Sequence, residues 1–334
     1  MERNRGVRMA AAKDARTIAV VGAGIAGLTA ARELQRAGHQ VTVLEMDSKA
    51  GGRMSTQHLF GGSFDDGAQF FTVKDQRFGV LVDDWVKRGI VVDWFHSQLI
   101  RGGGSNPDGF PRYCGAKGMA GIIADLAEGI TIRFNSEVAR LEKAKDHYSL
   151  TLADGSKETA EAVIVTTPSP VSLNLVNNIS KTSVEVLDQI SYNPCITVLA
   201  SLEGESALTE WGGLRISGDY IDWIADNHLK GISPEVTTIT LQAMPDFSRE
   251  HWEDEDDKVA VRLLDSASKI LDSEPVDYTV RRWLHAKPKV VHSDVFFDVS
   301  EGTLLLAGDG FQGYRVEGAA VSGLEAARSL LKKF

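Results

Sequence analysis

The sequence lacks the features that mark secreted, metal-binding and membrane proteins. Its only two cysteines, Cys114 and Cys195, are too few and too far apart for a disulfide framework or a thiolate metal cluster. No group of histidines and carboxylates has the spacing of a metal site, so we expect no metal. No apolar run approaches the roughly 18 residues of a membrane-spanning helix, so we expect no membrane partner. A reducing compartment, the cytoplasm, is the expected location.

Basic residues are also in the minority. The 334 residues include 36 Lys and Arg against 46 Asp and Glu, which gives a net charge of -10. Nucleic acids and anionic membranes reward basic patches, so we expect neither as the main partner. The 43 % hydrophobic content is ordinary for a globular chain, and the length allows one large or two modest domains.

The first 16 residues are basic and have no apolar core, which excludes a secretory signal. We expect residues 1–16 to form a disordered arm, because chain termini are commonly mobile. A transit-peptide remnant is the alternative, and Met9 is a second candidate start.

The first strong pattern is a strand, a helix and a second strand. Residues 17–21 are apolar and rich in β-formers, 28–37 have a helical apolar stripe, and 41–45 again have strand character. Such a β-α-β unit of about thirty residues is the context in which a glycine-rich turn binds a dinucleotide.

Three glycines occupy the turn between the first strand and the helix. Gly22 allows the tight turn, Gly24 lets the backbone approach a pyrophosphate, and Gly27 lets helix and strand pack closely. Ile25 and Ala26 stand in this turn as further cofactor-binding candidates, and the N-terminal amides of the helix that follows attract phosphates.

Glu45 ends the second strand of this unit. Its carboxylate suits ribose hydroxyls and repels a 2′-phosphate, which disfavours NADP as the occupant. Next comes Gly51-Gly52-Arg53, where a glycine pair and a guanidinium suit a second close approach to a phosphate. The alternative is a loop with a surface arginine.

The segment "DDGAQFFTVKD" (65–75) places a glycine and two aromatic residues between acidic ends. Gln69 and Phe70 suit a flavin ring, and Lys74 suits an anionic substrate. The alternative is a core strand with Phe70 and Phe71 packed on opposite faces.

The second strong pattern is "LLLAGDGFQGYRVEGAAVSG" (304–323). A strand leads to Gly308 and Asp309, and a helix opens near Val316. Asp309 suits a ribityl hydroxyl, and the amides from Val316 to Gly318 suit a flavin pyrimidine ring, where negative charge collects on reduction. The alternative is an ordinary strand-turn-helix.

Together, GAGIAG with Glu45, GGRM, DDGAQFF, GAKGM and AGDG…RVEGAAVSG resemble the flavin-containing amine oxidase superfamily. Within it, "DGAQFFTVKDQRF", "DWIADN" and "RRWLHAKP" resemble the renalase-like branch most closely. The similarity covers nearly the whole chain from residue 17.

The resemblance implies a non-covalently bound FAD and hydride transfer to flavin N5 from a small-molecule substrate. In renalase-like enzymes that substrate is a dihydropyridine isomer of NAD(P)H, and O2 reoxidises the flavin to give hydrogen peroxide. The FAD contacts that the resemblance implies are Ile25, Glu45, Arg53, Gln69, Phe70, Val138 and Asp309. The substrate contacts that it implies are Phe70, Phe71, Thr72, Lys74 and Tyr113.

Two further substrate candidates come from residue chemistry. Trp223 suits stacking on a planar ring, with a half-buried core tryptophan as the alternative. His285 lies near two arginines and a lysine in sequence, with a structural or surface histidine as the alternative.

Two positions depart from the renalase-like pattern: Gly310 stands where an aromatic residue is common, and His285 stands where tyrosine is common. The substrate therefore stays open. An amine oxidase or desaturase of the same superfamily is one alternative, and a non-catalytic flavin-binding scaffold is another. A covalent flavin link is not expected, because neither cysteine lies in the C-terminal flavin segment.

The expected fold class is α/β, of the p-hydroxybenzoate-hydroxylase-like type that the resemblance implies. A Rossmann-like FAD-binding domain (17–75, 131–170 and 295–334) is interleaved with a smaller α+β substrate domain (76–130 and 171–294).

Overall fold

The computed structural model describes residues 15–96, 98–101, 105–106, 109–208, 211–216, 218 and 220–334. The arm expected over residues 1–16 lies outside them except for its last two residues. In the described part of the chain, no helix is long and apolar enough to cross a membrane.

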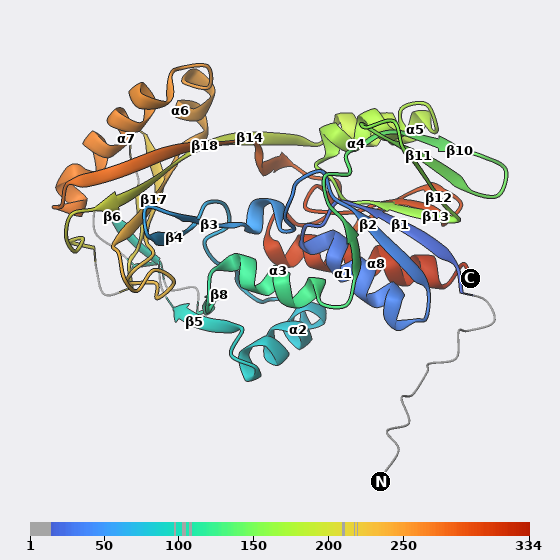
Figure 1. Cartoon of the computed structure of the whole chain (residues 1–334), viewed down its shortest axis with the longest axis horizontal. Helices are drawn as coiled ribbons and strands as arrows, with labels where there is room; N and C mark the ends of the chain where they lie inside the picture. The colour runs from blue at the N-terminus through green and yellow to red at the C-terminus, as the bar shows by residue number, and fades with distance from the viewer. Residues whose placement is uncertain are drawn as a thin grey trace, which may run out of the picture.

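The N-terminal β-α-β unit lies at the centre of a six-stranded sheet, so the expected Rossmann-like α/β fold is confirmed (Figure 1). The strand order is β19-β20-β13-β1-β2-β9, and every pair is parallel except β19 with β20 at the edge. The bounds are β1 (Thr17–Val21), β2 (Gln40–Leu44), β9 (Thr131–Arg133), β13 (Ala162–Val165), β19 (Phe297–Ser300) and β20 (Leu304–Leu306). All four residues of β13 are buried, as an internal parallel strand requires.

Four helices share one hydrophobic core beside this sheet. They are α1 (Ile25–Arg36), α2 (Gln76–Lys87), α3 (Met119–Ala127) and α8 (Val316–Leu331). Helix α1 begins three residues before the expected start, directly after Gly24. The packing also differs from the expected domain limits, because α2 and α3 come from 76–130 yet bury their apolar faces against α1.

A second core cluster lies against the same sheet. It includes the meander β10 (Val138–Lys143), β11 (Tyr148–Leu152) and β12 (Lys157–Ala160), with α4 (Ser169–Val176) and α5 (Lys181–Asp188). The hairpin expected at Asp154–Gly155 is confirmed, with Gly155 at φ +83 between β11 and β12. The single helix expected over 171–190 is two helices.

The six-stranded sheet and the two core clusters on it form the first lobe. The second lobe is built on a seven-stranded sheet in the order β18-β14-β17-β16-β15-β6-β7. Its bounds are β6 (Gln98–Arg101), β7 (Ser105–Asn106), β14 (Ser191–Leu202), β15 (Gly213–Ile216), β16 (Ile221–Asp226), β17 (Thr238–Ala243) and β18 (Pro275–Val290). Helix α7 (Asp256–Leu271) and the short α6 (Pro245–Glu250) pack on it, and the long strands β14 and β18 reach back toward the first lobe (Figure 1).

Short elements lie between the lobes. A 3-10 turn, η1 (Gly52–Met54), precedes the hairpin of β3 (Thr56–Leu59) and β4 (Gly62–Asp65), and β5 (Val91–Phe95) pairs with β8 (Arg112–Gly115). The segment 66–75 follows β4 as an extended loop, so it is not the core strand that was the alternative interpretation.

Candidate functional site

The glycine turn lies where β1 passes into α1. Gly22 has a φ of +99, and a β-carbon on Gly27 would overlap the carbonyl oxygen of Gly22 and lie 2.8 Å from Thr166 Oγ1. A β-carbon on Gly24 would meet nothing within 4 Å. Gly22 and Gly27 therefore serve the fold, whereas Gly24 leaves open space at the N-terminus of α1.

Glu45 lies beneath this turn and is only 6 % exposed. Its Oε2 accepts a hydrogen bond from the Ala23 N–H at 2.6 Å, and its Oε1 accepts one from the Asp47 N–H at 3.0 Å. Burial raises the pKa of Glu45, and these N–H groups oppose that rise. From the end of β2, the Glu45 carboxylate thus stabilises the glycine turn between β1 and α1.

Thr166 lies at the carboxyl ends of the parallel strands, where the N-terminal and C-terminal motifs approach each other. It follows β13, which lies between β1 and β20, and its Oγ1 donates to the Val21 carbonyl at 2.8 Å. A β-carbon on Gly308 would lie 3.6 Å from the Thr166 carbonyl, and Gly308 has a φ of +130, which favours glycine. The N-terminal and C-terminal motifs therefore flank one residue.

Arg53 and Asp309, the residue after Gly308, form an ion pair with Nη2 and Oδ1 3.0 Å apart. Arg53 also donates to the His285 carbonyl at 3.1 Å. The Tyr192 hydroxyl donates to Asp309 Oδ1 at 3.1 Å, and its ring centroid lies 5.4 Å from that of His285. Predicted residues from three segments therefore meet around the Asp309 carboxylate.

The protonation of this cluster follows from its burial. Burial, and then the positive charge of Arg53, lowers the pKa of His285. Burial, and then the negative charge of Asp309, raises the pKa of Tyr192 to about 12. At neutral pH the cluster therefore holds a neutral His285 imidazole and a protonated Tyr192 phenol, which donates a hydrogen bond to Asp309.

Tyr192 is a site residue that the sequence reasoning missed, and it accounts for Gly310. A β-carbon on Gly310 would lie 2.6 Å from Ser169 Oγ and 3.2 Å from the Tyr192 hydroxyl. Tyr192 and Ser169 thus occupy the space that a side chain at position 310 requires. Tyr192 stands in a plain strand sequence at the start of β14, and no spacing or motif marks it.

The segment after β4 packs on the Gly51–Arg53 turn. The Ala68 N–H donates to the Arg53 carbonyl at 2.8 Å, and a β-carbon on Gly67 would overlap that same carbonyl. Gln69 is 5 % exposed and donates from Nε2 to the Asp65 carbonyl at 2.6 Å. Its Oε1 is buried and has no hydrogen-bond partner among the residues that the structure describes.

Phe70 and Phe71 point into different lobes. Phe70 joins an aromatic cluster with Trp94, Phe95 and Trp223, at centroid distances of 5.3 to 6.4 Å. Phe71 is 3 % exposed and lies in the core of the first lobe. Trp223 is 2 % exposed and stacks on Phe95, so it is a core tryptophan, the alternative interpretation, rather than an open stacking surface.

The remaining predicted residues occupy three places. Thr72 is buried, and Tyr113 stacks on Phe71 with its centroid 5.8 Å away. Lys74 is exposed and its ammonium lies 4.6 Å above the Phe110 ring. Val138 is buried in the second core cluster.

The first turn of α8 anchors the end of the 66–75 segment. Glu317 Oε1 accepts hydrogen bonds from the N–H groups of Lys74 at 2.6 Å and Asp75 at 2.7 Å. Val316 and Gly318 flank Glu317, and a β-carbon on Gly318 would overlap the backbone of Gly313. Glu317 is thus a second positioning residue that the sequence reasoning missed, although an acidic residue in a first helical turn is a recognisable signal.

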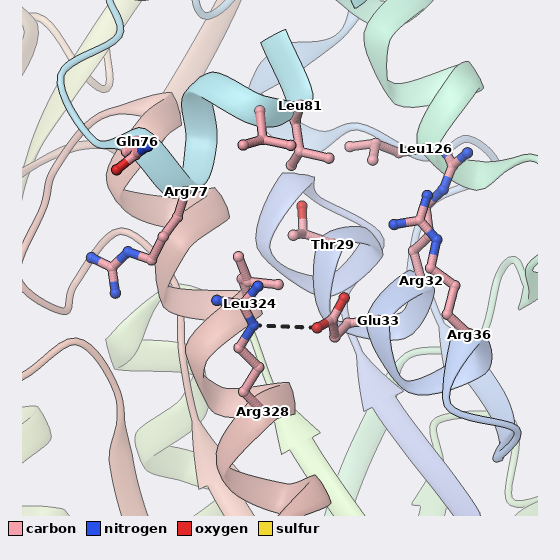
Figure 2. A pocket seen from close by; sticks show the side chains of 11 residues that line it. Thr29, Arg32, Glu33, Arg36, Gln76, Arg77, Leu81, Leu126, Leu324 and Arg328 are labelled. Atoms are coloured by element: carbon pink, nitrogen blue, oxygen red, sulfur yellow. Dashed lines mark hydrogen bonds and ion pairs between the residues drawn. The ribbon is translucent and has the colours of Figure 1, made fainter. Parts of the chain in front are cut away.

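A groove of about 360 Å³ lies away from this cluster, between α1, α2, α3 and α8 (Figure 2). Arg328 pairs with Glu33 across it at 3.2 Å, and Thr29, Leu81 and Leu324 face it. None of the predicted site residues lines this groove. In the part of the chain that the structure describes, no group of three or more His, Cys, Asp or Glu is placed to hold a metal ion.

Comparison with known families covers almost the whole chain. The family described as flavin containing amine oxidoreductase matches residues 92–331, and the NAD(P)-binding Rossmann-like domain matches residues 20–93. In fold the chain is similar to a putative protoporphyrinogen oxidase from Exiguobacterium sp. 255-15, with a TM-score of 0.76, 15 % identity, and 96 % of this chain and 100 % of that chain covered. It is also similar to wild-type putrescine oxidase bound to putrescine, with a TM-score of 0.72, 14 % identity, and 96 % and 99 % covered.

Sequence relatives match over shorter stretches. Protoporphyrinogen oxidase 2 of Arabidopsis thaliana is 40 % identical over 73 residues, which is 22 % of this chain and 14 % of that protein. An L-amino-acid oxidase of Siganus canaliculatus is 59 % identical over 39 residues, which is 12 % of this chain and 7 % of that protein. The aligned stretches therefore span less than two thirds of these relatives.

Proposed function

The chain belongs to the flavin containing amine oxidoreductase family, and on that premise we propose that it is an oxidase that binds FAD non-covalently. The proposed substrate is a dihydropyridine isomer of NAD(P)H, the renalase-like choice. When bound, FAD supplies a hydride acceptor at N5 and passes the two electrons to O2, which leaves as hydrogen peroxide.

The residues present fit this cofactor. Gly24 leaves open space at the start of α1, as a pyrophosphate approaching the amides requires. Gln69 Oε1 is a buried acceptor without a donor, and an unsatisfied buried acceptor costs about 1–3 kcal/mol unless a ligand N–H meets it. Glu45 would accept from the ribose of the adenosine, and Asp309 from a ribityl hydroxyl.

One observation carries the proposal: Thr166 has the glycine turn of the first motif on one side and Gly308 of the last motif on the other. A dinucleotide that contacts both motifs must lie along this edge of the sheet, which is where α/β folds bind ligands. The Arg53–Asp309 pair and the Gln69 segment stand at the same edge, between the two lobes.

The side chains favour a planar anionic substrate over an aliphatic amine. Phe70 and Trp94 are half-buried aromatic rings that pack edge-on against each other with centroids 6.4 Å apart, and together they offer an aromatic wall to a planar ring. Exposed Lys74 lies close in sequence and suits the phosphates of a nicotinamide nucleotide. Asp309 and Asp65 are each paired with a cation, so neither carboxylate is available for a substrate ammonium.

The chain's own groups would orient the substrate and exclude water from it. Burial, and then the charge of Arg53, lowers the pKa of His285, so at neutral pH its imidazole is in the form that can accept a proton. Tyr192 and Arg53 hold the Asp309 carboxylate in one orientation. No nucleophile is required, because hydride transfer forms no bond to the protein.

The test is anaerobic reduction of the FAD-loaded protein, followed by absorbance. We expect dihydropyridine isomers of NAD(P)H to bleach the flavin within seconds, and O2 to restore the colour with one hydrogen peroxide per substrate. Putrescine, L-amino acids and ordinary NADH serve as the comparison panel.

Each other outcome contradicts a stated part of the proposal. Bleaching by amines alone would support an amine oxidase of the same family. Bound FAD that no substrate bleaches would support a flavin-binding scaffold. A colourless protein that takes up no FAD on reconstitution would overturn the proposal altogether.

A further inference from the structure

Lys230 is a fully buried ammonium group between the two lobes. It lies in the turn between β16 and β17, and neither its side chain nor that of its partner Asp65 is exposed. Lys230 Nζ lies 2.6 Å from Asp65 Oδ2, 2.7 Å from the Gln69 carbonyl oxygen and 4.7 Å from the centre of the Trp94 ring. Burying a charge costs several kcal/mol, so partners on every side are needed to keep it.

These partners belong to the proposed flavin and substrate site. Asp65 also accepts from the Met119 N–H at 2.8 Å, so the pair is tied to the start of α3. Gln69 carries the buried acceptor Oε1, which meets no donor in the described part of the chain. Trp94 lies edge-on to Phe70 in the aromatic cluster.

Lys230 is one of four side chains of the second lobe that bind carbonyl groups of residues 65–69. The other three bonds run from Thr240 Oγ1 to the Asp65 carbonyl at 3.1 Å, from Trp283 Nε1 to the Asp66 carbonyl at 2.9 Å, and from Gln242 Nε2 to the Gly67 carbonyl at 2.6 Å. Because residues 66–70, which follow β4, pair with no strand among the described residues, these donors set the conformation of that stretch. The carbonyls of 65, 66, 67 and 69 thus all face the second lobe.

The amides of the same peptides must face the other way. A trans peptide places its C=O and N–H on opposite sides of the C–N bond. The Ala68 N–H follows this rule, since it donates to the Arg53 carbonyl in the first lobe. By the same rule, the Phe70 N–H points away from Lys230, and it has no acceptor among the described residues.

We infer that Lys230 is a positioning residue that, by holding the Gln69 carbonyl, aims the Phe70 N–H at the flavin as a hydrogen-bond donor. The inference rests on the proposed function, since it requires FAD beside Arg53. A purely structural ion pair needs only Asp65 as its partner. The bond to the Gln69 main chain and the contact with Trp94 are what connect Lys230 to the cofactor and to the aromatic wall.

The direct test follows the Phe70 amide in the wild-type protein labelled with 15N-phenylalanine. We expect FAD to shift the Phe70 N–H resonance and to slow its exchange with solvent by at least about tenfold, as a new hydrogen bond does. Wild-type protein that binds no FAD would refute the proposed function. Wild-type protein that binds FAD and leaves the Phe70 N–H unprotected would refute this inference alone.

The variants are Lys230→Met, Lys230→Arg and the double variant Lys230→Met with Asp65→Asn. The double variant leaves no unpaired buried charge and keeps an acceptor for the Met119 N–H, so it serves if the single variant does not fold. We expect the methionine variants to bind FAD about tenfold more weakly and to change its visible circular dichroism. Lys230→Arg should restore part of both properties.

The matched control is Asp226→Asn. Asp226 lies just before the same turn and accepts from the N–H groups of His228 at 2.8 Å and Leu229 at 2.9 Å without touching residues 65–70. We expect this control to lower the melting temperature while leaving FAD affinity and the flavin spectrum unchanged. If the Lys230 variants behave in the same way, the role of Lys230 is structural and the inference fails.

Discussion

Gly323 of α8 lies directly against the main chain of Ala26 in α1, because a β-carbon on Gly323 would overlap the Ala26 carbonyl oxygen. The distance between packed helices depends on the side chains at their contact, and Gly323 contributes no side chain there. The last helix of the chain thus supports the first turn of α1, next to the glycine turn that we assign to the pyrophosphate.

Gly323→Ala should therefore destabilise the fold. Overpacking of this kind costs about 1–3 kcal/mol, and the gain in helix propensity of about 1 kcal/mol offsets only part of it. Chemical denaturation measures the change. The control is Gly121→Ala in α3, whose β-carbon would have its nearest neighbour at 3.9 Å and which should be neutral or stabilising. Equal stability of Gly323→Ala and wild type would contradict the contact.

Gly24 and Gly27 should separate cofactor binding from folding. In Gly24→Ala the new methyl group meets no protein atom and φ is already −77, so the unfolding midpoint should not change. The methyl group stands where the pyrophosphate is proposed, so FAD affinity should fall by about tenfold or more. Gly27→Ala should lose both stability and affinity, because its β-carbon overlaps Gly22. Undiminished FAD binding by Gly24→Ala, measured by fluorescence titration, would place the pyrophosphate elsewhere.

His285 should make the folded protein less stable in mild acid. Its folded-state pKa is lowered by burial and then by Arg53, whereas an unfolded histidine titrates near pH ~6.5. The unfolded chain therefore takes up the proton first as the pH falls. The stability that His285 contributes is present above pH ~6.5 and is lost as the pH falls through the folded-state pKa.

His285→Asn should accordingly show a smaller loss of stability between pH 7 and pH 5 in otherwise identical denaturation curves. Arg53→Gln tests the cause, because removing the guanidinium should move the His285 resonance titration in NMR toward its ordinary pKa. An unchanged pH dependence in His285→Asn would show that other groups dominate the acid response.

Both cysteines should be unreactive in the folded protein. Burial is the largest cause that raises the pKa of Cys114 and of Cys195 to about 11. At pH 8 only about a thousandth of each thiol is then ionised, and the thiolate is the reactive form. We expect negligible reaction with Ellman's reagent in native buffer and two thiols per chain in guanidinium chloride. Rapid labelling of one thiol in the native protein would contradict this, and Cys195→Ser would identify it.

Much of the first lobe could be predicted from the sequence because its signals are local. The apolar run of β13 and the glycine at position 155 each depend on neighbours only a few residues away. The domain limits were harder to predict from the sequence, because nothing in the sequence of α2 or α3 indicates which lobe their apolar faces will cover.

The site shows the same division. Gly22, Gly24 and Gly27 stand at a fixed spacing because one turn of backbone dictates it, and Glu45 follows β2 of the same β-α-β unit. The sequence alone therefore predicts where a dinucleotide would approach. Tyr192, Lys230 and Glu317 act on residues more than a hundred positions away. Only the tertiary structure decided those roles, because burial and the direction of a carbonyl group depend on which distant segments meet, and no periodicity along the chain records that meeting.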